Sequence, residues 1–124
     1  MNRRLVALVV ATIAALSAAA SPVAHHSQAQ YTEADGAIEI TGVVARVEMS
    51  NPHSFLYIDV EKDGKSVRWA LEMQSLRGLA MNGWVDDTVK IGDRISAIGR
   101  PARNGAPAMY CEVVKLPDGR QMRS

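Results

Sequence analysis

The chain has 124 residues, with 14 lysines and arginines against 13 aspartates and glutamates, so its formal net charge at pH 7 is only +1. A balance this close to neutral excludes the basic field with which nucleic-acid-binding proteins attract phosphates. A single cysteine excludes an internal disulfide, so the fold must be stabilised by packing.

The first 24 residues have the pattern of a cleavable secretory signal. Two arginines precede an uncharged apolar run from Leu5 to Ala20, which is shorter than the roughly 20 residues that span a bilayer as a helix, so a retained anchor is the weaker alternative. Small residues follow, and cleavage is expected after Ala20 or after Ala24, the second of which would make His25 the first residue. Removal of both arginines leaves 12 basic and 13 acidic side chains, which gives no attraction to an anionic membrane. We therefore expect a periplasmic or secreted protein with a signal peptide over residues 1–24.

A polar arm over residues 25–36 is expected to lead into a domain over residues 37–124. In this domain apolar and polar residues alternate with period two, which predicts strands over 37–49, 54–61, 66–72, 94–100 and 108–116. The pair Asp63-Gly64 predicts a tight hairpin between the second and third strands. Ser75 can cap a short helix over 76–81, which Asn82-Gly83 would end, and residues after Leu116 are expected to form a turn and tail.

Three strands, one helix and two strands in this order predict a mainly β fold, a small five-stranded barrel of the oligonucleotide/oligosaccharide-binding (OB) type. An open sandwich of five strands is the alternative architecture. The apolar positions change parity across Gly42, so we place a β-bulge there. Cys111 alternates with apolar neighbours and is expected to be a buried, inert thiol. The expected core consists of Ile40, Val43, Val47, Leu56, Ile58, Val60, Trp69, Leu71, Leu79, Ile95, Met109 and Val113.

A set of short motifs in a fixed order covers almost all of the chain after the signal: His25-His26-Ser27, Thr41-Gly42-Val43-Val44, Asn51-Pro52-His53, Trp69-Ala70-Leu71-Glu72, Gly83-Trp84, Gly92-Asp93 and Leu116-Pro117-Asp118-Gly119-Arg120. In these motifs the chain resembles a family of exported bacterial proteins of unknown function, DUF6152. The resemblance implies export and a small β-barrel, and it implies no known reaction. Gln28 stands where members usually have an aromatic residue, which weakens the case for a firmly packed arm.

The three histidines are the candidate metal ligands. His25 and His26 begin where the signal ends, and His53 lies in a turn between the first two strands. Imidazole is the commonest protein ligand of copper and zinc, and a free amine at His25 would add a donor. Strand direction places Glu72, at the end of the third strand, at the same end of the barrel as His53. We therefore expect copper, or less favourably zinc, at His25, His26 and His53 with Glu72 as a neighbour; a solvated linker and a simple turn are the alternatives.

The outer face of the second and third strands is a second candidate site. Phe55 and Tyr57 beside Arg68 could stack a small organic or carbohydrate ligand, or dock a partner protein, because this face binds ligands in such barrels. The alternative is that Tyr57 and Arg68 form an ordinary cross-strand pair and that the arm covers Phe55.

Catalytic patterns are missing from the sequence. No serine lies in a Gly-x-Ser-x-Gly elbow, no glycine-rich phosphate loop is present, and the carboxylates on the second and third strands have the spacing of solvated positions. We therefore expect a small binding protein and not an enzyme.

Overall fold

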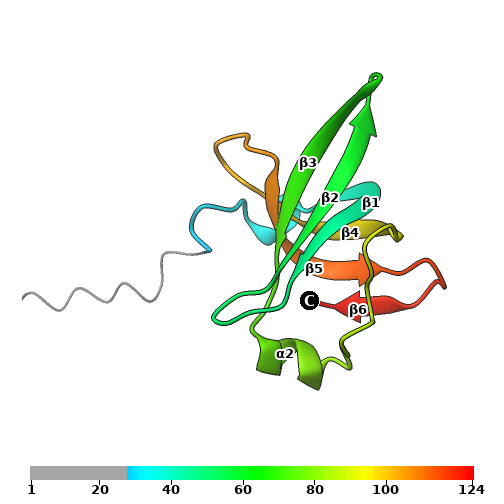
Figure 1. Ribbon diagram of the computed structural model, residues 1–124. Helices are drawn as coiled ribbons and strands as arrows, with labels where there is room; N and C mark the ends of the chain where they lie inside the picture. The colour runs from blue at the N-terminus through cyan, green and yellow to red at the C-terminus, as the bar shows by residue number, and fades with distance from the viewer. Residues whose placement is uncertain (1–27) are drawn as a thin grey trace, which may run out of the picture.

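The computed structural model describes residues 28–124, so the expected signal peptide (1–24) and the candidate ligands His25 and His26 lie outside the described residues. Figure 1 shows a strand-rich body with the short helix α2 at one end. Its elements in chain order are η2 (Ala34–Gly36), β1 (Ile38–Glu48), β2 (Phe55–Lys62), β3 (Lys65–Glu72), α2 (Leu76–Met81), β4 (Arg94–Pro101), β5 (Ala108–Lys115) and β6 (Gln121–Arg123). No helix within these residues is long and apolar enough to cross a membrane.

Five strands form a closed barrel. The hydrogen-bonded order is β3-β2-β1-β4-β5-β6, and an additional parallel pairing of β3 with β5 closes the ring. The closing ladder is short: Ala70 lies opposite Ala108, Leu71 opposite Met109 and Glu72 opposite Tyr110. The predicted OB-like barrel, with its helix between β3 and β4, is therefore confirmed, and the open sandwich is excluded.

The chain after β5 forms a sixth strand, so the expectation of a simple tail is wrong. Leu116 donates its N–H to the carbonyl of Arg120 at 2.8 Å, which reverses the chain direction. Residues 121–123 then pair antiparallel with β5, Met122 opposite Val114. The reason is local: Pro117-Asp118-Gly119 makes a tight hairpin turn, with Gly119 at a φ of 90° that favours glycine.

The β-bulge of β1 lies at Ala45 and not at Gly42. The register with β2 shifts between Val44 and Arg46, whereas Gly42 stays in the ladder with β4. The face of the strand therefore changes three residues later than predicted: Val44 is buried, and Val43, expected in the core, is 39% exposed. Gly42 has a different role, because a Cβ there would lie 2.6 Å from the carbonyl oxygen of Asp59 on β2.

A second bulge corrects the expected core in β5. Gly99 of β4 lies opposite Cys111 and Ile98 lies opposite Val113, so Glu112 is the extra residue. Beyond it Val114 is buried, and Val113, expected in the core, is only half-buried. Cys111 precedes the bulge and is fully buried, as predicted, and burial raises the pKa of its thiol to about 11.

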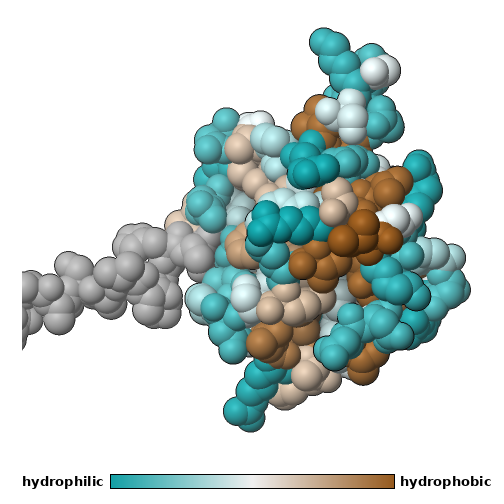
Figure 2. All heavy atoms as spheres, viewed as in Figure 1, coloured by the Kyte–Doolittle hydropathy of each residue, from teal (hydrophilic) through white to brown (hydrophobic). Residues whose placement is uncertain are grey.

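The other expected core residues lie inside the barrel or pack against it, and the interior also takes residues that the alternation did not predict. These additions are Val44, Met73, Trp84, Val89, Ala97, Val114 and Leu116, with Met49 and Met122 at the edge. The hairpin of β2 and β3 extends beyond the barrel (Figure 1), and Figure 2 shows that its tip is hydrophilic. Val67 near this tip is 41% exposed because it lies past the point where β5 covers β3.

Candidate metal-binding site

Side-chain hydrogen bonds fix the loop between β1 and β2, which carries His53. The hydroxyl of Ser54 accepts from the N–H of Ser50 at 3.2 Å and donates to its carbonyl oxygen at 3.1 Å. The side-chain carbonyl of Asn51 accepts a hydrogen bond from the N–H of Leu76 at 3.1 Å, beside the Ser75 cap of α2. Because the loop is tied to itself and to α2, it presents His53 on a rigid base.

One ring nitrogen of His53 is directed into the protein. Nδ1 lies 3.1 Å from the carbonyl oxygen of Met73 and 3.5 Å from Oε1 of Glu72. Both neighbours are acceptors, so the neutral ring carries its proton on Nδ1 and keeps a lone pair on Nε2. No residue in 28–124 forms a hydrogen bond with Nε2, and the side chain is 30% exposed. The predicted approach of Glu72 to His53 is therefore confirmed.

Glu72 points outward from the barrel and is nevertheless buried, with a relative exposure of 5%. A buried carboxylate is costly unless it is hydrogen-bonded or paired. Here Oε1 faces His53, and Oε2 accepts a short hydrogen bond from the hydroxyl of Tyr31. Tyr31, Glu72 and His53 thus form one continuous polar chain.

Residues 28–33, which we name the strap, cover this carboxylate. The N–H of Thr32 donates to the carbonyl of Pro101 at 3.0 Å, and the N–H of Arg103 donates to the carbonyl of Gln30 at 2.9 Å. The guanidinium of Arg103 donates to the carbonyl of Tyr31 at 2.7 Å and pairs with Glu33. This part of the polar arm is therefore packed, against the expectation, because Tyr31 supplies the buried anchor that Gln28 cannot.

At one end of the barrel, outward-facing side chains of neighbouring strands lie next to one another, and Glu72 is one of them. Successive ladders place side by side Glu48 of β1, Phe55 of β2, Glu72 of β3, Tyr110 of β5 and Arg100 of β4. The ring of Tyr31 lies 6.0 Å from that of Tyr110. Cζ of Arg100 lies 5.0 Å from the centre of the Tyr110 ring on β5. The strap therefore packs on a cationic and aromatic platform next to the candidate site.

Sequence reasoning missed Tyr31 and Tyr110. A signal for the first was available, because Tyr31 is the one aromatic residue in the arm and a lone aromatic in a polar segment often anchors it. The position of Tyr110 beside Glu72 depends on the parallel β3–β5 ladder, which no local pattern predicts.

Alkaline pH is expected to destabilise the protein. Burial and the hydrogen bond to Glu72 raise the pKa of Tyr31 above its ordinary value of 10.0, and burial raises the pKa of Tyr110 in the same direction. Above pH 10 the unfolded chain loses these protons first, so the free energy of unfolding falls as pH rises. We expect urea midpoints to drop between about pH 9 and about pH 11, and to drop less in Tyr31→Phe. An identical pH dependence in both proteins would contradict this assignment.

The predicted aromatic face keeps Phe55 and Tyr57 together, but it lacks the expected cross-strand pair. Phe55 and Tyr57 stack, with ring centres 6.2 Å apart and an angle of 23° between the planes. Arg68 lies opposite Asp59 and donates two hydrogen bonds to its carboxylate, at 2.8 and 3.0 Å. The expected Tyr57–Arg68 pair is therefore wrong, since Ala70 is the residue opposite Tyr57.

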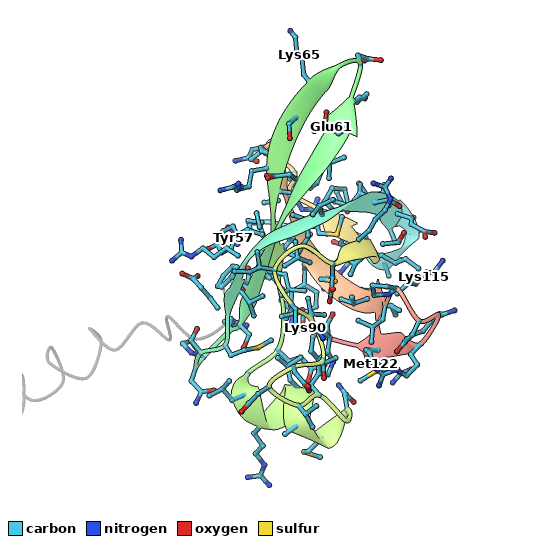
Figure 3. All side chains as sticks on the ribbon, turned by 45° about the vertical axis from the view of Figure 1, so that its right-hand side comes forward. Tyr57, Glu61, Lys65, Lys90, Lys115 and Met122 are labelled. Carbon is cyan, nitrogen blue, oxygen red and sulfur yellow. The ribbon has the colours of Figure 1, made fainter. Side chains whose placement is uncertain are left out.

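Tyr57 has its own partners on β1. Its hydroxyl donates to Oε2 of Glu48 at 3.0 Å, and Cζ of Arg46 lies 5.2 Å from its ring centre. In Figure 3 Tyr57 lies on the outer side of β2, well away from Glu61 and Lys65 at the hairpin tip. Within residues 28–36, no side chain forms a hydrogen bond or an aromatic pair with Phe55 or Tyr57.

A third surface is apolar. A groove of about 260 Å³ lies between α2 and the segment that follows it, lined by Met49, Leu76, Leu79, Ala80, Trp84, Val85 and Asp86. Figure 2 shows further hydrophobic surface on the face in front of β4 and β5. The hydrogen bonds at its lining, from Nε1 of Trp84 to the carbonyl of Arg123 and from the N–H of Val85 to the hydroxyl of Thr88, involve no metal-binding side chain. The polar chain at His53 is therefore the better candidate for a metal.

Within residues 28–124 no three His, Cys, Asp or Glu side chains lie close enough together to hold a metal ion. His53 and Glu72 are brought into contact there, and their expected partners His25 and His26 precede the described residues.

The fold and site define an OB-like barrel with a docked N-terminal strap and a loop histidine oriented by a buried carboxylate. The family model described as "Family of unknown function (DUF6152)" matches residues 12–109, and the chain therefore belongs to this family. A comparison with curated proteins finds no match.

Proposed function

We propose that this chain is an exported binding protein that holds one copper(II) ion, or less favourably zinc, without catalysing a reaction. Nε2 of His53 is the ligand from the barrel, and His25 and His26 supply the remaining imidazoles. After cleavage behind Ala24, the free amine of His25 adds a further nitrogen donor.

The orientation of the His53 ring carries the proposal. A metal-binding imidazole typically donates its other N–H to a carboxylate or a backbone carbonyl, which fixes the tautomer and directs the free lone pair outward. His53 has both kinds of acceptor at Nδ1, Glu72 and the carbonyl of Met73. Glu72 is accordingly an orienting neighbour and not a direct ligand, because its two oxygens are directed to His53 and Tyr31.

The position of the strap supports the participation of the N-terminal histidines. His26 precedes Gln28, the first described residue, by two positions, and two extended residues span up to about 7 Å. Residues 28–31 add little reach, because they form a turn in which the N–H of Tyr31 donates to the carbonyl of Gln28 at 3.1 Å. Tyr31 in turn contacts the same carboxylate as His53. In Figure 1 the start of the described chain and the loop between β1 and β2 lie on the same side of the barrel. The short tether from Gln28 and the contact of Tyr31 with the carboxylate beside His53 support the participation of His25 and His26.

Calorimetric titration with copper(II) tests the proposal, using a chain that begins at His25. We expect one ion per chain with a dissociation constant far below millimolar, and weaker binding of zinc. A chain that begins at Ser27 is the control, and it should lose most of the affinity while keeping the same barrel. Binding no tighter than millimolar to the longer chain would end the proposal.

A small organic or carbohydrate ligand on the outer face of β2 is the second candidate. The stacked, half-buried rings of Phe55 and Tyr57 favour it, since such a pair offers a flat apolar platform. The guanidinium of Arg68 is bound to the carboxylate of Asp59, so Arg68 is not part of this platform. Phe55→Ala should abolish binding of an aromatic or sugar probe on this face and leave copper(II) affinity unchanged.

A further inference from the structure

We propose that the strap is a latch, closed by the hydrogen bond from Tyr31 to Glu72, and that its closing and copper(II) binding at His53 strengthen each other. The coupling rests on the proposed function, whereas the latch itself does not. Tyr31 is then a positioning residue, which acts on His53 through Glu72.

One side chain of the strap is buried, that of Tyr31. Of residues 28–36, Tyr31 alone is buried, with a relative exposure of 5%, and the others lie on the surface or are half-buried. Two backbone hydrogen bonds join the strap to residues 101 and 103, and Arg103 adds contacts that are half exposed to water. Arg100 adds two long hydrogen bonds, to the carbonyl of Thr32 at 3.5 Å and to Oε1 of Gln28 at 3.4 Å. A segment with so few buried contacts opens more easily than the barrel beneath it.

The shared carboxylate links the strap to the histidine. Tyr31 occupies Oε2 of Glu72, and this leaves Oε1 beside Nδ1 of His53. When the strap opens, Glu72 loses its hydrogen-bond donor and its cover. Docking of the strap therefore helps to orient the barrel ligand, His53, through Glu72. By thermodynamic linkage, a metal that prefers the docked state must also stabilise it.

Hydrogen exchange of the metal-free protein tests the latch. The amides of Thr32 and Arg103 report on docking, because they donate to Pro101 and to Gln30. In Tyr31→Phe we expect these amides to exchange at least about tenfold faster, since a hydrogen bond to a charged group is lost.

Tyr57→Phe is the matched control, because it removes another hydroxyl that donates to an outward glutamate, Glu48. It should leave the exchange of Thr32 and Arg103 unchanged, and slow exchange of the Leu71 amide will show that the barrel is folded in both variants. Equal exchange rates for the strap amides in Tyr31→Phe and in the unmodified protein would overturn the latch.

Copper(II) alone, added to the chain that begins at His25, tests the coupling. We expect saturating copper(II) to slow exchange at Thr32 and Arg103 at least about tenfold, and Tyr31→Ala to weaken copper(II) affinity at least about tenfold relative to Tyr57→Ala. If copper(II) binds but leaves the hydrogen exchange of the Thr32 and Arg103 amides unchanged, the coupling is overturned. If the unmodified chain does not bind copper(II), the proposed function is overturned. The hydrogen exchange of the metal-free protein would still decide whether the latch exists.

Discussion

Replacing His53 by alanine should lower copper(II) affinity at least about 100-fold, because loss of an orienting partner alone typically costs 10–100-fold and here the ligand itself is removed. The barrel should remain intact. The His53 side chain is 30% exposed, and the loop keeps the bonds of Ser50, Ser54 and Asn51. Calorimetric titration of the variant beside the unmodified chain measures the change.

Phe55→Ala is the matched comparison, since Phe55 lies two residues further along the chain on the neighbouring outer face. It should keep the copper(II) affinity of the unmodified chain. Undiminished binding in His53→Ala would show that His53 is not a ligand.

Replacing Leu71 by alanine should lower the free energy of unfolding by about 2–5 kcal/mol, the usual range for a fully buried leucine. Leu71 has no exposed surface and lies at the seam of the barrel, opposite Leu56 on one side and Met109 on the other. Domains of this kind have a total stability of about 5–15 kcal/mol, so the loss is a large part of the whole. Urea unfolding followed by tryptophan fluorescence measures it.

Val67→Ala provides the comparison on the same strand. Val67 is 41% exposed in the projecting hairpin, and its truncation should change the free energy of unfolding by less than about 1 kcal/mol. A similar loss of unfolding free energy in Leu71→Ala and Val67→Ala would contradict the claim that the seam is packed more tightly than the hairpin.

The five barrel strands and the helix were predictable because local patterns determine them, whereas β6 was missed. The helix over 76–81 was predicted with its observed bounds from the Ser75 cap and the Asn82-Gly83 stop, and Gly83 has the φ of 87° that such a stop requires. Asp63 and Gly64 both have positive φ, as a two-residue hairpin turn demands. The motifs also identified the family, which the match over residues 12–109 confirms.

The faces of β1 and β5 were mispredicted for one physical reason. In each strand two valines are adjacent, Val43-Val44 and Val113-Val114, and only a bulge decides which of the two enters the core. Hydropathy is the same for both members of each pair. The bulge positions depend on contacts with the neighbouring strands, which a single sequence does not contain.

The candidate site was only half predictable. Strand directions placed Glu72 near His53, and their contact at 3.5 Å agrees with this. The burial of Glu72 was not predictable, since its cover, Tyr31, lies 41 residues away in the sequence and docks only after β3 and β5 have closed the barrel.

Intact mass measurement of the natively exported protein, under conditions that retain bound metal, tests the account most directly. We predict the mass of a chain that begins at His25 with one copper ion bound. A chain that keeps residues 1–24, or a processed chain that carries no metal when copper is supplied, would contradict the claim that processing delivers two imidazoles to the oriented ring of His53.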